Sequence, residues 1–341
     1  MQSGLPLCTK MSQNLPDYYE KFLEALKAKG PAQNILVKQL CDLLNLQSRA
    51  IYNRLNGETQ FTINEAILLC RSYNIDIQEI LMPDNAAIMY QSGTIGRKMN
   101  RPTDYLELLS QLLLWLSSLK NPRIQYTSHD FPLFLTCHFP RLIKLKLAIW
   151  SYYSWELKSF TSTSMFDLDD KEFSAVEELC QKVTKIYSQI PSKEYLPSSL
   201  FDNTIYQIQF LIDVEGFFRP NQVKYLIDDL EAEINMMEDQ AISGTKNPAS
   251  INFYKSDMLN QALNFMAEWD DGCRVFTMID SPNFIYSESP RITQHMKDYF
   301  RKIINTSESL TQTNGKERRK YFNHLYQKVK VLRDMNGRNG M

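Results

Sequence analysis

The feature that most constrains this chain is a series of closely spaced helix signals at residues 35–82. Leucines that recur every three or four residues predict a first helix over about 35–45: Leu36, Leu40, Leu43 and Leu44. Three more short helices are expected, each preceded by a residue type that caps helix N-termini: Ser48, Thr62 and Asp76. Asn56 and Gly57 suit a left-handed end to the second helix, so the stretch predicts four helices joined by tight turns.

Two helices joined by a three- or four-residue turn form a helix-turn-helix, whose second helix enters the DNA major groove. Residues 35–82 resemble the Cro/C1 (XRE) type of repressor DNA-binding domain. The likeness rests on the apolar–small pair Leu40-Cys41, the turn residue Leu46, the opening Gln47-Ser48, the anchor Ile51, the closing Leu55-Asn56-Gly57 and the two helices of 62–81. Asn45 stands where many members have glycine, but asparagine tolerates positive φ. The alternative is a generic helical bundle.

The resemblance implies which side chains contact double-stranded DNA. These are Lys38, Gln47, Ser48, Arg49, Tyr52, Asn53 and Arg54. Gln47 and Asn53 suit adenine edges, whereas Arg49 suits guanine or a phosphate. The resemblance also implies a homodimer on two half-sites about one helical turn apart.

Charge disfavours tight non-specific binding to nucleic acid. The net charge is −1, and residues 14–84 carry seven basic against nine acidic side chains, a balance of −2. Phosphate neutralisation supplies most of the affinity in non-specific binding. Specific binding needs only a local basic face, which Lys38, Arg49 and Arg54 would supply.

Cysteine usage and hydropathy indicate a cytoplasmic protein. The six cysteines are scattered and form no CxxC pair, which fits a reducing compartment and no structural zinc. The first ten residues lack a secretory pattern, and the leucine-rich run at 112–116 is too short to span a bilayer. We therefore expect no contact with a membrane.

The chain divides into a head and a larger second domain. Residues 1–15 are expected to be a disordered tail, and an amphipathic helix at 17–29 completes a five-helix head over 16–84. Residues 85–102 are expected to form a linker in which Gly93 and Gly96 provide flexibility. The second domain covers 103–341.

The second domain is expected to be α+β, which makes the whole chain mainly α. Helices are predicted over 103–120, 131–155 (two helices), 173–190, 205–218, from 220 to 244, 290–305 and 316–333. Strands are predicted over 123–128, 251–254, 263–266, 274–278 and 283–286. Asp270, Asp271 and Gly272 signal a hairpin. The expected sheet is small and antiparallel.

Two apolar stripes in this domain fit either a core face or a dimer seam. The first is Leu106, Leu109, Leu113 and Leu116, and the second is Val223, Ile227, Leu230, Ile234, Met237 and Ala241. The second helix also carries an acidic face, which is expected to be solvated: Asp228, Asp229, Glu231, Glu233, Glu238 and Asp239.

The search for catalytic motifs identifies no reaction that this chain would catalyse. P-loop, GxGxxG, HExxH and GxSxG patterns are absent, and the four histidines have no metal-ligand spacing. We expect no cofactor and no metal. A nuclease alternative combines Asp130 with Glu156 and Lys158, because carboxylates and a lysine can serve Mg²⁺-assisted hydrolysis. The aromatic segment 131–155 fits either a plain core or an apolar pocket for a small-molecule effector.

Three further stretches resemble a group of Bacteroidetes-type regulators in which a repressor-like head precedes a long domain of unknown function. They are DFPLFLTCHFP at 130–140, IPSKE at 190–194 and NGKERRKYFNHLYQKV at 314–329. The expected function is a non-enzymatic, sequence-specific DNA-binding transcriptional regulator with a sensing or dimerising second domain. The alternatives are a DNA-targeted nuclease and a protein–protein adaptor.

Overall fold

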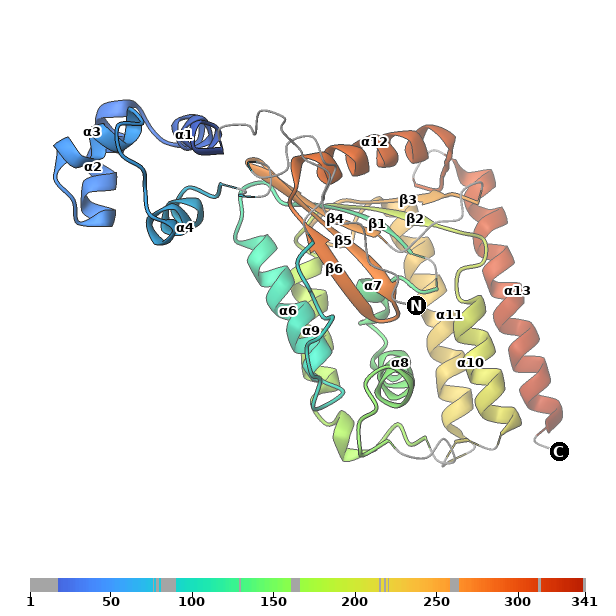
Figure 1. Cartoon of the computed structure of the whole chain (residues 1–341). Helices are drawn as coiled ribbons and strands as arrows, with labels where there is room; N and C mark the ends of the chain where they lie inside the picture. The colour runs from blue at the N-terminus through green and yellow to red at the C-terminus, as the bar shows by residue number, and fades with distance from the viewer. Residues whose placement is uncertain are drawn as a thin grey trace, which may run out of the picture. The chain divides into compact units, whose positions relative to one another are not determined.

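The structure is a computed structural model that describes residues 18–75, 77, 80, 90–128, 130–160, 166–214, 216–217, 219, 221–257, 264–311 and 314–339. The chain separates into two compact units, Met1–Met89 and Tyr90–Met341 (Figure 1). The expected tail at 1–15, the cap Asp76 and residues 81–89 lie outside the described residues.

Unit 1 is helical throughout its described part. Its helices are α1 (Tyr18–Lys29), α2 (Gln33–Leu44), α3 (Ser48–Leu55) and α4 (Ile63–Ser72), and most of the expected fifth helix falls on residues that are not described. Leu26, Leu40, Ile51 and Leu69 are fully buried in one core. Because these residues come from all four helices, the expected apolar spacing does bring the helices together.

The turns of unit 1 follow the sequence signals with one correction. Asn45 adopts a left-handed φ of 53° after α2, as its side chain allows. Thr62 forms a capping box with Glu65, whose backbone N–H donates to Thr62 Oγ1 at 3.3 Å. The predicted cap at Ser48 is wrong by one residue, because Gln47 is the extended N-cap and its carbonyl accepts the N–H groups of Ala50 and Ile51.

The described strands of unit 2 form one seven-stranded sheet. They are β1 (Arg123–Thr127), β2 (Ser192–Leu196), β3 (Ile251–Lys255), β4 (Asn264–Trp269), β5 (Gly272–Asp280), β6 (Asn283–Ser287) and β7 (Glu308–Ser309), in the order β6-β5-β4-β1-β2-β3-β7. The β1–β2 and β2–β3 pairs are parallel, whereas the remaining pairs are antiparallel. The hairpin predicted at 270–272 is confirmed, since Trp269 pairs with Gly272.

The expectation of a small antiparallel sheet is therefore wrong. The error arises because β2, which makes both parallel pairs, was not predicted. β2 reads Ser-Lys-Glu-Tyr-Leu, and its polar first half hides the strand pattern. Yet Ser192 and Glu194 are buried together with Tyr195 and Leu196. Parallel neighbours require helical crossovers, which the helices between β1 and β2 and between β2 and β3 provide.

Helices cover the two faces of this sheet unequally (Figure 1). α12 (Pro290–Thr306) lies on one face, where Phe300 packs on Tyr195. The other helices belong to the larger core: α6 (Asp104–Ser117), α7 (Leu133–Thr136), α8 (Pro140–Tyr153), α9 (Val176–Tyr187), α10 (Asp202–Asp213), α11 (Asn221–Ser243) and α13 (Gly315–Asn339). Within the described residues, no helix is long and apolar enough to cross a membrane.

Both apolar stripes belong to the core of unit 2. Leu106, Leu109, Leu113 and Leu116 on α6 are buried, as are the six stripe residues of α11. The acidic face of α11 is only partly solvated, because Asp229 and Glu233 are buried, whereas Glu231 and Asp239 are exposed as expected. Arg333 on α13 pairs with Asp228 at 2.7 Å and with Glu231 at 2.6 Å. A dimer interface would therefore need other residues.

The first residues of unit 2 bind β6. The backbone N–H of Thr94 donates to the Phe284 carbonyl at 3.1 Å, and the Phe284 N–H donates to Thr94 Oγ1 at 2.8 Å. Gly93 was expected to provide flexibility, but a Cβ built there would lie 2.2 Å from the Phe284 carbonyl oxygen. Glycine is required at this position because the backbone approaches β6 so closely.

Candidate functional site

Unit 1 presents a polar face on α3. Gln47, Ser48, Arg49 and Tyr52 are exposed, whereas Ile51 points into the core and is fully buried. The turn after α2 places α3 as the second of two adjoining helices. The exposed residues therefore share the outer side of a short helix that its apolar residues fix to the rest of the unit.

Two of the residues predicted to contact DNA are half-buried and bonded within unit 1, and a third, the exposed Ser48, has its Oγ 3.6 Å from Cys41 Sγ. Arg54 Nη2 pairs with Glu65 Oε1 at 3.2 Å, and its guanidinium lies 5.6 Å from the centre of the Phe61 ring. The Asn53 amide, oriented to donate, reaches Glu58 Oε2 at 3.2 Å and the Arg49 carbonyl at 3.1 Å. Both side chains are half-buried, so they hold the loop after α3 against the unit.

The other predicted contact residues remain at the surface. Lys38 on α2 is exposed, as are Gln47, Ser48, Arg49 and Tyr52 at α3. Lys38 and Arg49 are therefore the two exposed cations of the predicted set, since Arg54 is paired. A face with two free cations and several hydrogen-bonding groups has the composition of a base-reading surface with few phosphate contacts.

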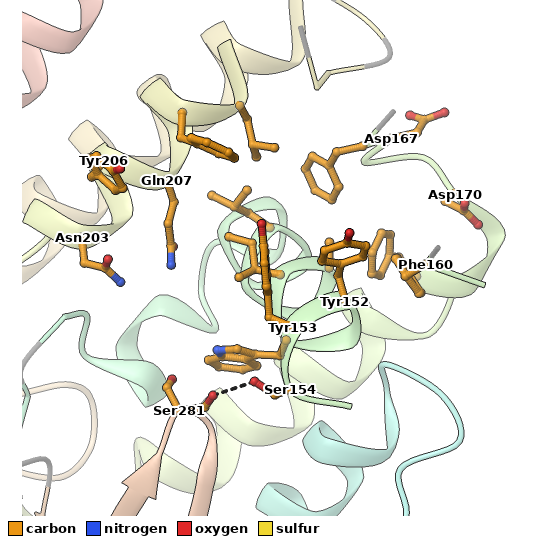
Figure 2. Close-up of a pocket in the computed structure, with 18 of the residues that line it drawn as sticks. Tyr152, Tyr153, Ser154, Phe160, Asp167, Asp170, Asn203, Tyr206, Gln207 and Ser281 are labelled. Atoms are coloured by element: carbon orange, nitrogen blue, oxygen red, sulfur yellow. Dashed lines mark hydrogen bonds between the residues drawn. The ribbon is translucent and has the colours of Figure 1, made fainter. Parts of the chain in front are cut away.

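Unit 2 contains a cavity of about 520 Å³ between α8 and α10 (Figure 2). The chain after α8 and the β5–β6 turn at Ser281 complete its wall, and Ser154 Oγ donates to the Ser281 carbonyl at 2.9 Å. Eight aromatic residues line it: Trp150, Tyr152, Tyr153, Phe160, Phe166, Phe173, Tyr206 and Phe210. A concave, largely aromatic site of this size is typical of small-molecule pockets.

A buried ion pair lies at the base of this pocket. Lys146 on α8 is almost fully buried, and its Nζ lies 2.6 Å from Asp130 Oδ2 and 2.7 Å from Gln207 Oε1. Asp130 also accepts the backbone N–H of Thr204 at 3.1 Å and the Thr204 hydroxyl at 2.9 Å. Asp130 lies just after the end of β1. Its carboxylate binds the first turn of α10, the helix that follows the end of β2. Ligands of α/β sheets commonly bind at this carboxyl edge of parallel strands.

The pKa values of this pair move in the directions that burial and pairing dictate. Burial lowers the pKa of Lys146, although Asp130 opposes this shift. Burial alone would raise the pKa of Asp130, but Lys146, Asn203 and Thr204 together hold it below its usual value. The Asp130 carboxylate is therefore stabilised by several donors at once.

The sequence identified only part of the pocket. Trp150, Tyr152 and Tyr153 from the aromatic segment do line it, whereas Phe134 from the same segment packs in the core against Tyr187. The aromatic residues of α10 and of 160–173 were not expected there. A usable signal was present on α10, where Tyr206 and Phe210 lie one helical turn apart and remain exposed.

The residues of the nuclease alternative are not assembled on a strand. Asp130 lines the pocket, while Glu156 and Lys158 follow α8 and line an adjoining groove together with Arg97 and Arg101. Glu156 has a left-handed φ of 48°. Across the part of the chain that the structure describes, no group of three or more His, Cys, Asp or Glu residues could hold a metal ion.

A second buried polar cluster lies beneath β2. Lys246 Nζ donates to Ser192 Oγ at 2.7 Å and lies 3.2 Å from the centre of the Tyr187 ring, and the Tyr187 hydroxyl donates to Glu194. Burial lowers the pKa of Lys246 to about 7 and raises that of Glu194. No sequence motif indicated this cluster, and none of its members lines the pocket.

The likeness of residues 35–82 to Cro/C1-type repressors rests on the residues quoted for it above. Comparison of the chain with protein-family models, with curated proteins and with solved structures finds no match.

Proposed function

We propose that this protein is a sequence-specific DNA-binding transcriptional regulator, with unit 1 as its DNA-binding head and unit 2 as its sensing part. One observation carries the proposal: α3 exposes Gln47, Arg49 and Tyr52 while Ile51 fixes the helix to the core. An exposed polar helix that follows another helix across a tight turn is the arrangement with which helix-turn-helix proteins read the major groove.

The groove face in this proposal is smaller than the sequence alone suggested. Gln47 would read adenine, and Arg49 would read guanine or bind a phosphate. Arg54 is assigned a supporting role, because its ion pair with Glu65 keeps it half-buried. Since few cations face outward, affinity would come from two heads acting together, and we propose a homodimer in the cytoplasm.

The test is selection of bound sites from random double-stranded DNA, followed by gel-shift titration of the selected site. Gln47→Ala and Arg49→Ala should each weaken binding by about 1–3 kcal/mol, as expected for the loss of a base contact. Arg71→Ala is the matched control, because it removes one exposed positive charge from α4 and leaves α3 intact.

The same titration separates this proposal from the alternatives. An adaptor would select no DNA sequence, and a nuclease would cleave the selected DNA in the presence of Mg²⁺. Equal affinities of the wild type and a Gln47→Ala, Arg49→Ala double variant would overturn the assignment of α3. Light scattering with and without the selected DNA measures the mass, and a monomer in both conditions would refute the dimer.

A further inference from the structure

The charges around the pocket select against anionic ligands. Three carboxylates line the described cavity, Asp130, Asp167 and Asp170, and no lysine, arginine or histidine belongs to its described lining. Lys146 is buried beneath the wall and paired with Asp130, and Arg219, which is outside the described lining, pairs with Asp167 and Asp169. A phosphate or carboxylate entering this space would meet negative charge and find no free cation to bind it.

The same carboxylates are already engaged, which also disfavours a cationic ligand. Asp130 is held by Lys146 and its other donors. Asp167 and Asp170 each accept the backbone N–H two residues further on, at 3.0 and 2.9 Å. Asp167 also accepts from Gln222 at 2.6 Å and lies 3.7 Å from Arg219. A cation would have to compete with these donors for each carboxylate.

Two amide groups on α10 remain available for an uncharged ligand. Gln207 uses its Oε1 to accept from Lys146, which leaves its Nε2 as a donor. Asn203 uses its Nδ2 to donate to Asp130 at 3.1 Å, which leaves its Oδ1 as an acceptor. The two residues are one turn apart on the same helix face and both line the cavity. Together they offer one donor and one acceptor to the same ligand.

Flat aromatic surfaces stand beside these amides. Tyr206 and Tyr153 are 67% and 63% exposed, although aromatic side chains of this size usually pack inside. Figure 2 shows Tyr153 and Gln207 pointing into the same space between α8 and α10. A planar ring placed there would stack on a tyrosine and keep its edge within reach of the amides.

We infer that this pocket binds an uncharged, planar nitrogen heterocycle of the nucleobase type, carried as a free base or a nucleoside and without phosphate. Gln207 Nε2 donates to the ring edge, and Asn203 Oδ1 accepts from it. The aromatic side chains of α8 and α10 hold the two ring faces. The effector role of this ligand rests on the proposed regulatory function, whereas its binding does not.

The experiment is calorimetric titration of the full-length protein, without DNA, with adenosine, guanosine, inosine, cytidine, uridine and thymidine. Each nucleoside is compared with its free base and its 5′-monophosphate. At least one nucleoside or base is expected to bind with one molecule per chain. Its monophosphate is expected to bind at least about tenfold more weakly, because the carboxylates repel the added charge.

Two variants test the assigned contacts. Gln207→Glu keeps an oxygen for Lys146 but removes the donor, and it should weaken binding by about tenfold or more. Tyr206→Ala removes a stacking surface that is mostly exposed and should weaken binding by about tenfold. Tyr225→Ala is the control, because Tyr225 is a partly exposed tyrosine on α11 outside the pocket.

The outcomes decide between ligand classes. Binding of none of the bases or nucleosides at millimolar concentration overturns the inference, as does a monophosphate that binds as tightly as its nucleoside. Unchanged affinity in Gln207→Glu overturns the assigned edge contact. Because DNA is absent, a failure here leaves the DNA-binding proposal standing, and a failure of DNA selection leaves the binding result standing.

Discussion

The two units present their candidate surfaces in opposite ways. In unit 1 the surface is the convex side of one helix, α3, and its residues lie within a short stretch of sequence. In unit 2 the surface is concave, and its walls come from segments as far apart as Asp130 and Ser281. A convex helical surface depends on one helix being anchored, whereas a concave one depends on the packing of many elements.

This difference has a physical cause in what each unit buries. The core of unit 1 consists of apolar side chains, and no polar side chain is fully buried in its described part. Unit 2 buries charged groups within its core, among them Lys146, Glu194, Glu233 and Lys246. Buried charge is stable only with the right partners, so unit 2 should respond strongly to pH and to the loss of one member of a buried pair. Unit 1 buries no charged group in its described part and should respond little to pH.

The largest expected effect is on unit 1. Ile51→Asp places an unpaired charge in a fully buried position and should unfold the head, which abolishes DNA binding. All four tryptophans, Trp115, Trp150, Trp155 and Trp269, lie in unit 2, so tryptophan fluorescence should not change. Hydrogen exchange over 18–75 measures the loss of the head.

Tyr52→Asp is the control for this substitution, because it introduces the same charge at the neighbouring exposed position. It should leave amide protection in the head intact. If Ile51→Asp also shifted tryptophan fluorescence, the two units would not be energetically independent and the comparison between them would fail.

The next effect concerns the ion pair at the base of the pocket. Asp130→Ala leaves Lys146 buried without its carboxylate and should destabilise unit 2 by about 3–5 kcal/mol, measured by urea unfolding followed by tryptophan fluorescence. Adding Lys146→Met should recover most of this loss. Asp298→Ala, which breaks a solvent-exposed pair with Arg301, should cost no more than about 1 kcal/mol. Equal losses in both single variants would contradict the role assigned to burial.

A pH-dependent effect is expected from Glu233 on α11. Burial raises its pKa to about 8, and the Thr136 hydroxyl that donates to it at 2.6 Å opposes this shift. Because the folded state holds the proton more tightly, the contribution to stability is complete below the unfolded pKa of about 4.5 and is lost as pH rises towards 8.

Glu233→Gln removes this titration. Between pH 5 and pH 8 the wild type should lose about 3 kcal/mol of stability relative to the variant, at about 1.4 kcal/mol per pKa unit. Lys246 titrates in the opposite sense in both proteins, since its lowered pKa favours stability at higher pH, and so it cancels in the difference. A constant difference between the two proteins across this range would show that Glu233 is ionised throughout.

The smallest expected effect on stability concerns the capping box of unit 1. Thr62→Ala removes the hydroxyl that accepts the Glu65 N–H and should cost about 1 kcal/mol, seen as faster hydrogen exchange in α4. Thr59→Ala, on the same loop and outside the cap, is the control. A loss of protection that extended into unit 2 would argue against separate units.

The sequence predicted the helices well because each carries its own signals. Pro290 begins α12, and Thr62 begins α4 through a capping box that can be recognised from residue types alone. The hairpin at Asp270 and Asp271 was equally local. Elements of this kind can be predicted from a short window of sequence, because the window contains the spacing of the apolar residues, the helix caps and the turn residues.

The sequence did not predict the features that depend on contacts between residues far apart in the chain. β2 is polar along half its length, and it is a strand because β1 and β3 flank it and because Tyr187 and Lys246 bond to its buried Ser192. Most of the pocket wall was missed for the same reason, since Asp130 and Gln207 are neighbours only after the β1–β2 crossover has formed and α10 has packed. Tertiary contacts decide such cases, and no local pattern encodes them.

The parallel strands also set a time order for the folding of this chain during synthesis. Unit 1 occupies the first part of the chain, and the hydrogen bond from Phe61 to Tyr19 spans 42 residues, so the head can fold early. β1 stands at the centre of the sheet, but its partners β2 and β4 begin only at Ser192 and Asn264. Until the ribosome has released those strands, both edges of β1 stay unpaired. Slow, long-range closure of this kind leaves an aggregation-prone interval, during which a chaperone would protect the unpaired edges of β1.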